Sequence, residues 1–597
     1  METEAEAQVC RARDLLKMGD YVGVYDVAQK ALENDSADPA LLYLAVLGLA
    51  RSGAISQAMH FYGQVKSRLP LSEENLSLEA RLYKDQFLAC QDPPKKNKLG
   101  LQARDLYLRA YQIQKNYYPA INAATLSLLI DDADACRSLA EEVLHICDTT
   151  PLAGNASDYF VHVTRAEACL LLERDAEAAE ALQQARETSA NDFGNLSTSF
   201  RQLSLICQAR GLATEVVEIL RPPTVITFTG QTLHGLGKSA GIDPDDEEMI
   251  RAQVRDVLSQ YNVKIAYGSL ACGADLIVAE EILNVGGELN VVLPFSREDF
   301  KRTSVTPGGP SWEKKFDTVL ERSASVSLIV DDAYTGYDLL YETCSLQIMG
   351  LAHLRAQTLG SRTYQLALWN GLPSASAAGT ASAMQRWKSL GEENLVITIP
   401  PPRRPGATPV TEPVQSKNKL KREMKSMIFA DIQGYGGMNE NQLPMFTALW
   451  LAKLEDIHRD YSDKILYLNT WGDAVFFIVD SVVTAADISL ALARMFPEKE
   501  LTAQGLPDRL GLRVAAHVGP IFGMHNPLTG HREFFGTHVT QAARLEPCTP
   551  VGSVYVTEPF AAMISIEGQG KYRCEYVGNH PLPKNYGKIR MYHLDKD

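Results

Sequence analysis

The chain has 597 residues and a formal net charge of −15, and 45% of its residues are apolar while 22% are charged. This length exceeds what a single hydrophobic core supports, so we expect three or four domains. The negative charge argues against a nucleic-acid-binding protein, whose surface would be basic, and no apolar run reaches the length of a membrane span.

Cysteine usage and the first residues indicate the compartment. The 10 cysteines are scattered without a recurrent spacing, which argues against structural zinc and favours a reducing environment. The first residues, METEAEAQVC, are acidic and lack the apolar core of a signal peptide. We therefore expect a cytoplasmic protein without a transmembrane segment.

Residues 1–220 are almost wholly helical in pattern. Small residues such as Ala28, Ala45 and Ala58 recur where paired helices must approach closely, and Gly53 marks a turn. The pattern resembles tetratricopeptide (TPR) repeats, which stack helix pairs of about 34 residues into an α-solenoid. The resemblance implies a concave surface that docks a protein partner. The alternative is a stack of helices that only packs against its neighbours.

The period changes after Pro222-Pro223, and residues 221–400 alternate short apolar β-branched runs with helical stretches. The apolar runs are residues 224–230, 263–269, 289–295, 326–332 and 395–400. Helical stretches separate them, such as residues 245–261 and 273–287. This alternation predicts a Rossmann-like α/β domain, with a parallel sheet and helices on both faces.

The segment GSLACGADLIVAEEIL, beginning at Gly268, resembles the SLOG group of Rossmann-like domains, which bind nucleotides or nucleotide-derived ligands. The resemblance implies a second nucleotide site, where strand ends and a helix N-terminus receive phosphate. Its residues would be Gly230, Gly268, Ser269, Gly273, Gly379 and Thr380. Alternatively, these glycines serve only sheet-to-helix packing. A P-loop is excluded, because Thr232 stands where that motif requires glycine.

Residues 401–424 have the composition of a linker. Proline dominates the first half, and the second half carries Lys417, Lys419, Lys421 and Arg422. A basic run can touch a membrane or nucleic acid, but such a run is more often solvated or forms a short helix.

Two motifs in residues 425–597 place carboxylates at the ends of predicted strands. In SMIFADIQGYGGM (426–438), Asp431 lies near the end of an apolar run, and a glycine-rich loop follows. In KILYLNTWGDAVFFIVD (464–480), two apolar runs predict a β-hairpin with Asp473 at its tip. If the hairpin lies beside the first strand, the two aspartates converge, and such a pair describes a two-metal site.

These motifs resemble the class III nucleotidyl (adenylyl/guanylyl) cyclase catalytic domain. Three further segments resemble the next strand, the dimer-interface helix and the closing hairpin of that family: GLRVAAHVGPIFG (511–523), FFGTHVTQAARLEP (534–547) and PKNYGKIRMYHL (583–594). The resemblance covers about residues 420–597. It implies an α+β ferredoxin-like fold and an active site that forms only in a homodimer.

The resemblance assigns residues to metal and phosphate binding. Asp431, Asp473 and the carbonyl of Ile432 would hold two Mg²⁺ or Mn²⁺ ions. Backbone amides would lie along the phosphates at Gln433, Gly434, Tyr435 and Gly436.

Other residues would come from the partner chain. Arg544 matches the family's transition-state arginine, and Lys584 matches a triphosphate-binding lysine. Thr540 stands where the family usually has asparagine, and its shorter reach implies slower turnover.

Asn469 and Glu533 occupy the base-reading positions, and both depart from the family's usual residues. Glu533 can accept a hydrogen bond from an exocyclic amine, which adenine and cytosine carry, whereas Asn469 both donates and accepts. Adenine is therefore the first choice. A pyrimidine is the second, because some bacterial immune cyclases of this class make cyclic pyrimidine nucleotides.

We therefore expect a cyclase that converts a nucleoside triphosphate, with ATP favoured, to a 3′,5′-cyclic nucleotide and pyrophosphate. The upstream domains would regulate it as sensors. One alternative is a catalytically degenerate, nucleotide-binding signalling scaffold. Another is that the SLOG-like domain is an enzyme that cleaves a glycosidic bond with Glu280 and Glu281.

Overall fold

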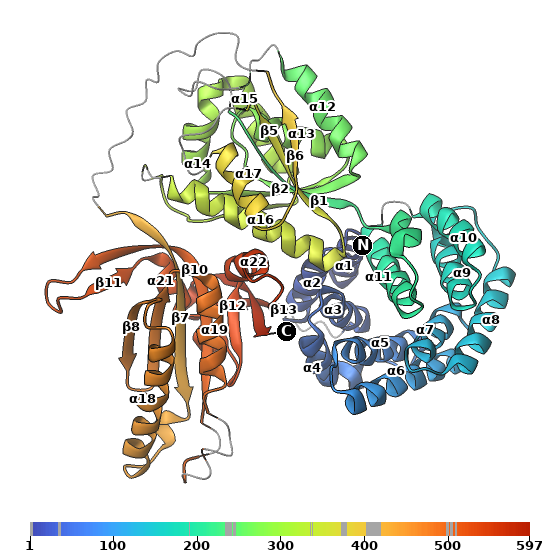
Figure 1. Cartoon of the computed structure of the whole chain (residues 1–597), viewed down its shortest axis with the longest axis horizontal. Helices are drawn as coiled ribbons and strands as arrows, with labels where there is room; N and C mark the ends of the chain where they lie inside the picture. Colours follow the sequence, from blue (N-terminus) through green and yellow to red (C-terminus); the bar gives the residue numbers. More distant parts are fainter. Residues whose placement is uncertain are drawn as a thin grey trace. The chain divides into compact units, whose positions relative to one another are not determined.

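The computed structural model describes residues 4–596 except 34–37, 190–191, 233–241, 243–245, 335, 337, 372–378, 401–419, 497–500, 502–504 and 508–509. The chain divides into two compact units (Figure 1). The first comprises residues 1–222 together with 357–361 and 575–578, and the second comprises the remainder.

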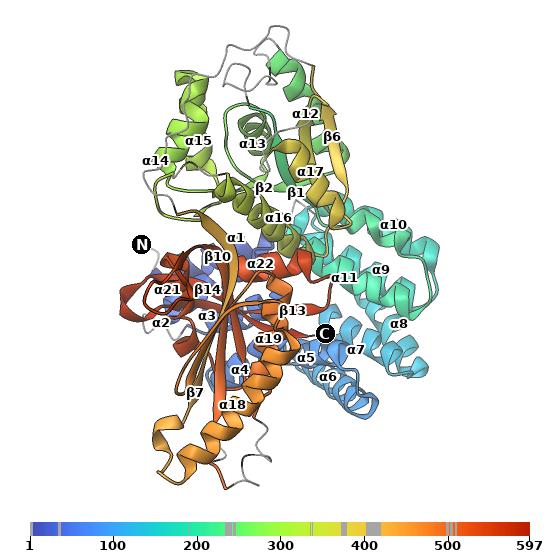
Figure 2. The ribbon, with the colours of Figure 1, turned by 60° about the vertical axis from the view of Figure 1, so that its left-hand side comes forward.

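The first unit is built from helices, as the sequence predicts. They are α1 (Glu4–Lys17), α2 (Tyr21–Glu33), α3 (Pro39–Ser52), α4 (Ile55–Val65), α5 (Glu73–Ala89), α6 (Pro93–Ile113), α7 (Tyr117–Leu129), α8 (Ala133–Thr149), α9 (Tyr159–Leu171), α10 (Asp175–Thr188) and α11 (Phe193–Ala209). The odd-numbered helices contact one another in turn, and α11 returns to contact α1. These odd-numbered helices form the inner row of the curved helical array (Figures 1 and 2).

Capping residues and small residues determine how these helices begin, end and pack. Asp38 accepts a hydrogen bond from the Ala40 amide at 2.7 Å and so caps α3, which ends at Gly53 with a φ of +87°. A Cβ at Gly48 would lie 2.9 Å from the carbonyl oxygen of Tyr21. A glycine at this position therefore lets α2 and α3 approach closely.

The second unit contains two sheets, and the first is a parallel sheet of six strands in the order β4-β3-β2-β1-β5-β6. The strands are β1 (Thr224–Gly230), β2 (Val263–Gly268), β3 (Glu288–Leu293), β4 (Ser325–Leu328), β5 (Thr363–Trp369) and β6 (Asn394–Thr398). The main helices of this part are α12 (Glu247–Gln260), α13 (Ala274–Asn284), α15 (Pro310–Arg322), α16 (Leu339–Leu359) and α17 (Thr380–Ser389). The predicted Rossmann-like architecture is confirmed.

Two details of this sheet differ from the sequence-based expectation. The strand predicted at 326–332 ends at Leu328, and β5 was not predicted although it pairs with β1. A polar residue, Gln365, lies in the middle of β5, fully buried, and its amide donates to the Thr227 hydroxyl at 3.3 Å. This polar position interrupts the apolar run by which a buried strand is recognised.

The second sheet has the order β13-β14-β12-β10-β7-β9-β8, with β11 paired to β10. Its strands are β7 (Arg422–Gln433), β8 (Ile465–Trp471), β9 (Ala474–Val479), β10 (Gly511–His525), β11 (Arg532–Phe535), β12 (Val554–Thr557), β13 (Tyr572–Pro581) and β14 (Lys588–Lys596). The helices are α18 (Gln442–Asp460), α19 (Val482–Ala493), α21 (Thr537–Ala542) and α22 (Glu558–Glu567). The mixed sheet with its helices confirms the predicted α+β class.

The segment predicted as a linker overlaps this sheet. Residues 401–419 lie outside the described residues, whereas Arg422 already begins β7. No helix in the described part of the chain combines the length and the apolar character that a membrane crossing needs.

The first prediction concerns Gly268, at the end of β2. A Cβ here would lie 2.1 Å from Cζ of the buried Phe228 ring, so Gly268→Ala should lower the free energy of unfolding by about 1–3 kcal/mol. Urea unfolding followed by tryptophan fluorescence measures this, because all 5 tryptophans lie in the second unit. Gly436→Ala is the matched control, since its Cβ would meet nothing within 4 Å. Equal stability of the two variants would contradict the packing argument.

A second prediction concerns two stacked histidines between β10 and α21. His517 Nε2 lies 2.8 Å from His538 Nδ1, and His517 Nδ1 lies 2.8 Å from the Thr557 hydroxyl. Burial, and then the nearby Arg422, lowers the pKa of His538 to about 4. Burial, together with His538, lowers the pKa of His517 well below its ordinary value.

Because both pKa values are lowered by folding, the unfolded chain binds protons more readily than the folded chain below about pH 6.5. The stabilisation is therefore complete above that pH and is lost as pH falls toward 4, by about 2–3 kcal/mol for His538. Urea unfolding at several pH values should show that His538→Gln flattens this dependence. His525→Gln, at an exposed position, should leave it unchanged. An unaltered slope in His538→Gln would exclude this explanation.

Candidate active site

The second sheet brings Asp431 and Asp473 together. Strands β7 and β9 are antiparallel, with Asp431 opposite Ala474, and Asp473 directly precedes Ala474. The amide of Ile432 donates to the Asp473 carbonyl at 3.1 Å, which locks the turn against β7. Burial raises the pKa of Asp473, and the negative charge of Asp431 raises it further. The two carboxylates are therefore close enough to repel one another.

An arginine missed by sequence reasoning lies beside this pair. Arg513 is directly opposite Asp431 on β10, and its Nη2 donates to Asp431 Oδ2 at 2.6 Å. Its Nε lies 2.6 Å from Glu546 Oε1, but the two atoms are not aligned for a hydrogen bond. Burial raises the pKa of Glu546 to about 7, against the opposing charge of Arg513, and both aspartates add to the rise. The four side chains thus form one charged cluster.

The donor set at this cluster fits a divalent cation that also binds a ligand. In the described part of the chain no three His, Cys, Asp or Glu side chains are grouped to hold a metal ion. Two carboxylates and the Ile432 carbonyl could supply only part of the six oxygen ligands that Mg²⁺ prefers. Phosphate oxygens of a substrate, or water, would have to complete the shell.

The glycine-rich loop follows the aspartate-bearing strand directly. Gly434 has a φ of +92°, a conformation that favours glycine, and a single 3₁₀ turn follows at Tyr435–Gly437. A Cβ at Gly436 would meet nothing within 4 Å. The backbone of this loop is therefore open to a ligand, and the side chain of Gln433 beside it is exposed.

Within one chain, the residues assigned to the partner's site make other contacts. No contact among the described residues joins Arg544 or Thr540 to Asp431 or Asp473. The Arg544 guanidinium lies over the Tyr586 ring at 3.9 Å, and its Nη1 is buried without a hydrogen-bond acceptor.

Thr540 and Lys584, which are also assigned to the partner's site, have constraints of their own. The hydroxyl of Thr540 donates to the Gly536 carbonyl at 3.3 Å. Lys584 is exposed and has a φ of +63°, in the left-handed region that non-glycine residues rarely adopt. Neither residue contacts the carboxylate pair in its own chain.

The base-reading positions lie on β8 and β11. Asn469 faces Phe476 across the β8–β9 pair, and Glu533 faces Met524 across the β10–β11 pair. The rings of Tyr467 and Phe534 meet at 6.1 Å, so the two strands lie close together. Glu533 Oε1 accepts from Asn526 Nδ2 at 2.5 Å, which holds the carboxylate in place.

The six residues of the second nucleotide site are spread over the parallel sheet. A Cβ at Gly230 would lie 2.2 Å from the Ala274 Cβ, and Gly268 leaves room for Phe228, so close packing alone accounts for both glycines. Gly273 has a φ of +114° and caps α13, whereas Gly379 caps α17 and is followed by the buried Thr380.

The N-terminus of α13 already has an acidic side chain beside it. Asp275 accepts from the Ala271 amide at 3.2 Å, and burial raises its pKa to about 7. The Ser269 hydroxyl is buried without a partner. Phosphate binding here stays a prediction. Glu280 and Glu281 instead pair with Arg251 on α12, which argues against a catalytic role for them.

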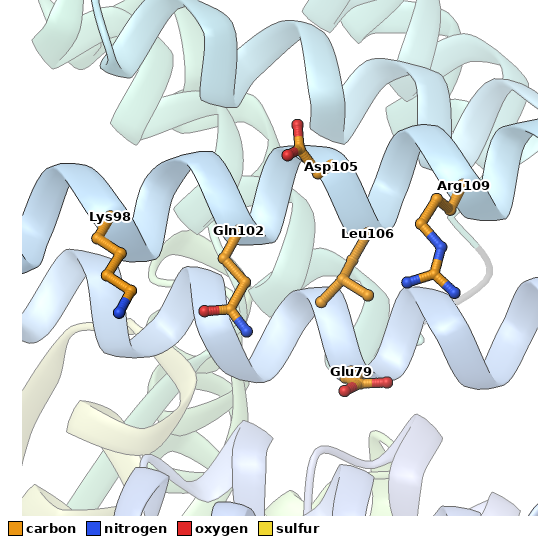
Figure 3. Close-up of a pocket in the computed structure, with 6 residues that line it drawn as sticks. All are labelled: Glu79, Lys98, Gln102, Asp105, Leu106 and Arg109. Atoms are coloured by element: carbon orange, nitrogen blue, oxygen red, sulfur yellow. The ribbon is translucent and has the colours of Figure 1, made fainter.

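A pocket of about 390 Å³ lies elsewhere, between α5 and α6 (Figure 3). Lys98, Gln102 and Arg109 extend from α6 toward α5, whereas Asp105 points the other way. Glu79 accepts from Lys66 at 2.5 Å and from the Tyr62 hydroxyl at 3.0 Å. Its charge is thus already compensated within the helical unit.

Comparison with known families identifies two regions. Residues 418–596 match the model of the adenylate and guanylate cyclase catalytic domain, and residues 20–127 match that of TPR-S, the Tetratricopeptide Repeats-Sensor. Neither match extends over the central parallel sheet, so its SLOG resemblance stays a prediction. No curated protein matches the chain.

Solved structures of cyclase domains resemble the same third of the chain. The adenylyl cyclase CyaB from P. aeruginosa is 16% identical, over 30% of this chain and 97% of that one, with a TM-score of 0.27. The guanylate cyclase domain of RhGC from Catenaria anguillulae, in complex with GTP, is 19% identical over 30% and 99%, with a TM-score of 0.24.

A third structure is the non-canonical dimeric guanylyl cyclase domain of RhoGC from Blastocladiella emersonii. It is 16% identical to this chain, over 30% of this chain and 100% of that one, with a TM-score of 0.25. The assignment of this domain rests on the family model, and the observed mixed sheet agrees with it. Residues 418–596 of this chain are a class III adenylate/guanylate cyclase catalytic domain.

Proposed function

We propose that this protein is a nucleotidyl cyclase that converts a nucleoside triphosphate, ATP first, to a 3′,5′-cyclic nucleotide and pyrophosphate. The observation that carries the proposal is the convergence of Asp431 and Asp473 at the end of β7, beside an open glycine-rich loop. In a domain that matches the cyclase family, this pair has the chemistry of a site for divalent cations.

The protein's own residues have distinct tasks. Asp431, Asp473 and the Ile432 carbonyl would hold two Mg²⁺ or Mn²⁺ ions, which when bound activate the 3′-hydroxyl and neutralise the triphosphate. The loop amides from Gln433 to Gly436 orient the phosphates. Arg513 compensates the charge of Asp431, to which it donates a hydrogen bond at 2.6 Å.

Completion of the site requires a second chain. Arg544 has a buried, unpaired Nη1 and does not contact the aspartates of its own chain, which supports a role opposite the partner's phosphates. Lys584 would assist at the triphosphate. A homodimer would thus hold two equivalent sites, and the helical region and the SLOG-like sheet would act as sensors that set how the two chains meet.

One observation favours the second candidate, a degenerate scaffold that binds nucleotide without turning it over. The hydroxyl of Thr540 is bonded to the carbonyl of its own helix, so it must be released before it can reach a substrate. Activity measurements separate the two functions.

Complementation tests the proposed shared site. Asp473→Asn and Arg544→Ala should each lower cyclase activity with Mn²⁺ by about 100-fold or more, because each removes a group from both sites of the dimer. In an equal mixture of the two variants, half of the dimers would contain one intact site. Mass spectrometry of the product should therefore show recovery to about a quarter of wild-type activity.

Asp456→Asn is the matched control, because this exposed aspartate only pairs with Arg459 on α18. It should retain wild-type activity. Full loss in each variant without recovery on mixing would contradict the shared site. An inactive wild-type protein that binds nucleotide would favour the scaffold.

Base selection tests the role of Glu533. A carboxylate only accepts hydrogen bonds, so ATP should be used about tenfold or more faster than GTP, which presents a carbonyl at the same position. Glu533→Gln adds a donor and should narrow this ratio, measured as kcat/KM for each triphosphate. Glu455→Gln, at an exposed position on α18, should not. Preference for CTP would support the pyrimidine alternative, and preference for GTP would exclude this role of Glu533.

A further inference from the structure

The inner row of the helical unit presents a cluster of basic side chains. Arg51 lies on α3, Arg81 and Lys84 on α5, and Arg201 on α11. These helices belong to the row in which α1, α3, α5, α7, α9 and α11 contact one another. The four cations therefore lie on one row of neighbouring helices, although they come from residues far apart in the sequence.

Shared neighbours show that these cations are close together. Burial raises the pKa of Asp85, and Arg81, Lys84 and Arg201 all oppose that rise. Burial also raises the pKa of Tyr43 on α3, and there both Arg51 and Arg81 act in the opposite direction. One carboxylate and one phenol thus each lie within reach of several of the four cations.

Lys84 is fully engaged by neighbouring side chains. Its ammonium donates to Asn122 at 2.9 Å and to Gln202 at 2.5 Å. The Gln202 amide in turn donates to Glu167 Oε2 at 3.1 Å. Burial lowers the pKa of Lys84 to about 8 and raises that of Glu167 to about 7. This network is complete and needs no ligand.

The arginines are not completed in this way. Arg51 Nε and Nη1 and Arg81 Nε are buried without a hydrogen-bond acceptor among the described residues. Asp85 Oδ2 lies 3.5 Å from Arg81 Nε, at the limit of a hydrogen bond. A second acid, Asp192, lies near Arg51. Its two carboxylate oxygens already accept hydrogen bonds from the backbone amide and the side-chain amide of Asn195, each at 2.8 Å. Buried guanidinium donors without acceptors are costly, and a ligand with several oxygens would satisfy them.

Two further features limit the kind of ligand. Arg201 Nη2 donates to the carbonyls of Gln357 and Thr358 at 2.7 and 2.5 Å, which fixes one edge of its guanidinium. Guanidinium forks match the geometry of phosphate oxygens better than a point charge does. Tyr118 adds to the raised pKa of Tyr43, so its ring lies beside the cluster. Its side chain is 38% exposed.

We propose that the inner face of the helical unit binds a small phosphate monoester through Arg51, Arg81 and Arg201, at a site separate from the cyclase centre. The phosphate oxygens accept hydrogen bonds from the guanidiniums of Arg51 and Arg81. The guanidinium of Arg201 is the third donor group. Tyr43 and Tyr118 are placed to contact an organic group attached to the phosphate. The helical unit is then a receptor for a phosphorylated small molecule.

Calorimetric titration of the full chain with AMP, and separately with inorganic phosphate, tests this site. The titration uses the Asp431→Asn/Asp473→Asn background with EDTA, which removes the metal-dependent centre as a competing phosphate site. We expect one AMP per chain, and Arg81→Gln should weaken binding by about tenfold or more. Arg81→Lys, which keeps the charge but loses the fork, should retain part of the affinity.

Arg174→Gln is the matched control, because Arg174 lies at the start of α10 and pairs only loosely with Glu177 at 4.0 Å. It should bind AMP like the parent protein. Arg51→Gln provides an independent variant if Arg81→Gln fails to fold, as judged by circular dichroism. Similar affinities for AMP and for inorganic phosphate would support the site and would identify the phosphate group as the main determinant of affinity. Absence of binding by both probes at millimolar concentration, or equal binding by the Arg51→Gln variant and the parent, would overturn the proposal.

Discussion

The catalytic domain depends on the forced proximity of two carboxylates. Asp431 and Asp473 are brought together by the antiparallel pairing of β7 and β9 and by the hydrogen bond from the Ile432 amide to the Asp473 carbonyl. Burial raises the pKa of Asp473, and the like charge of Asp431 adds to that rise. Backbone pairing holds the two carboxylates together against their mutual repulsion. A divalent cation bound by both carboxylates would relieve that repulsion.

Arg513 offsets part of the negative charge that this arrangement gathers. Its guanidinium bonds Asp431 and lies beside Glu546, so one cation serves two acids. A cation or a triphosphate entering the site must compete with this ion pair or redirect it. The fork of Arg513 has further donors besides the one that Asp431 accepts from, and these would be available to an incoming phosphate.

The sequence allowed the fold and the aspartate pair to be predicted because both follow from local patterns. Apolar runs mark β7 and β9, and the turn residues between β8 and β9 place Asp473 at a hairpin tip. The cluster of Arg513 and Glu546 could not be predicted, because it depends on the register that sets residue 513 opposite residue 431. Strand β5 was missed for a related reason, since buried Gln365 hides its apolar run until the Thr227 partner is known.

Register and tertiary partners also decide the meaning of the glycines. Gly230 and Gly268 suggested a phosphate cradle, yet the space beside each is occupied by Ala274 or Phe228. Gly434 is different, because its left-handed conformation opens a loop whose next glycine, Gly436, faces free space. A glycine therefore indicates close approach of something, and only the fold shows whether that is a side chain of the same domain or a ligand.

Arg544 and the two aspartates have complementary hydrogen-bonding groups. The guanidinium of Arg544 stacks on Tyr586, and one of its buried nitrogens has no acceptor, so part of its hydrogen-bonding capacity is unused. The two aspartates have the complementary property, a surplus of acceptors with a single cation between them. In the proposed homodimer, these two halves of the site would come together across the interface between two copies of the chain. Under that proposal, the upstream regions would govern the chemistry by controlling the interface, with no change needed at the aspartates.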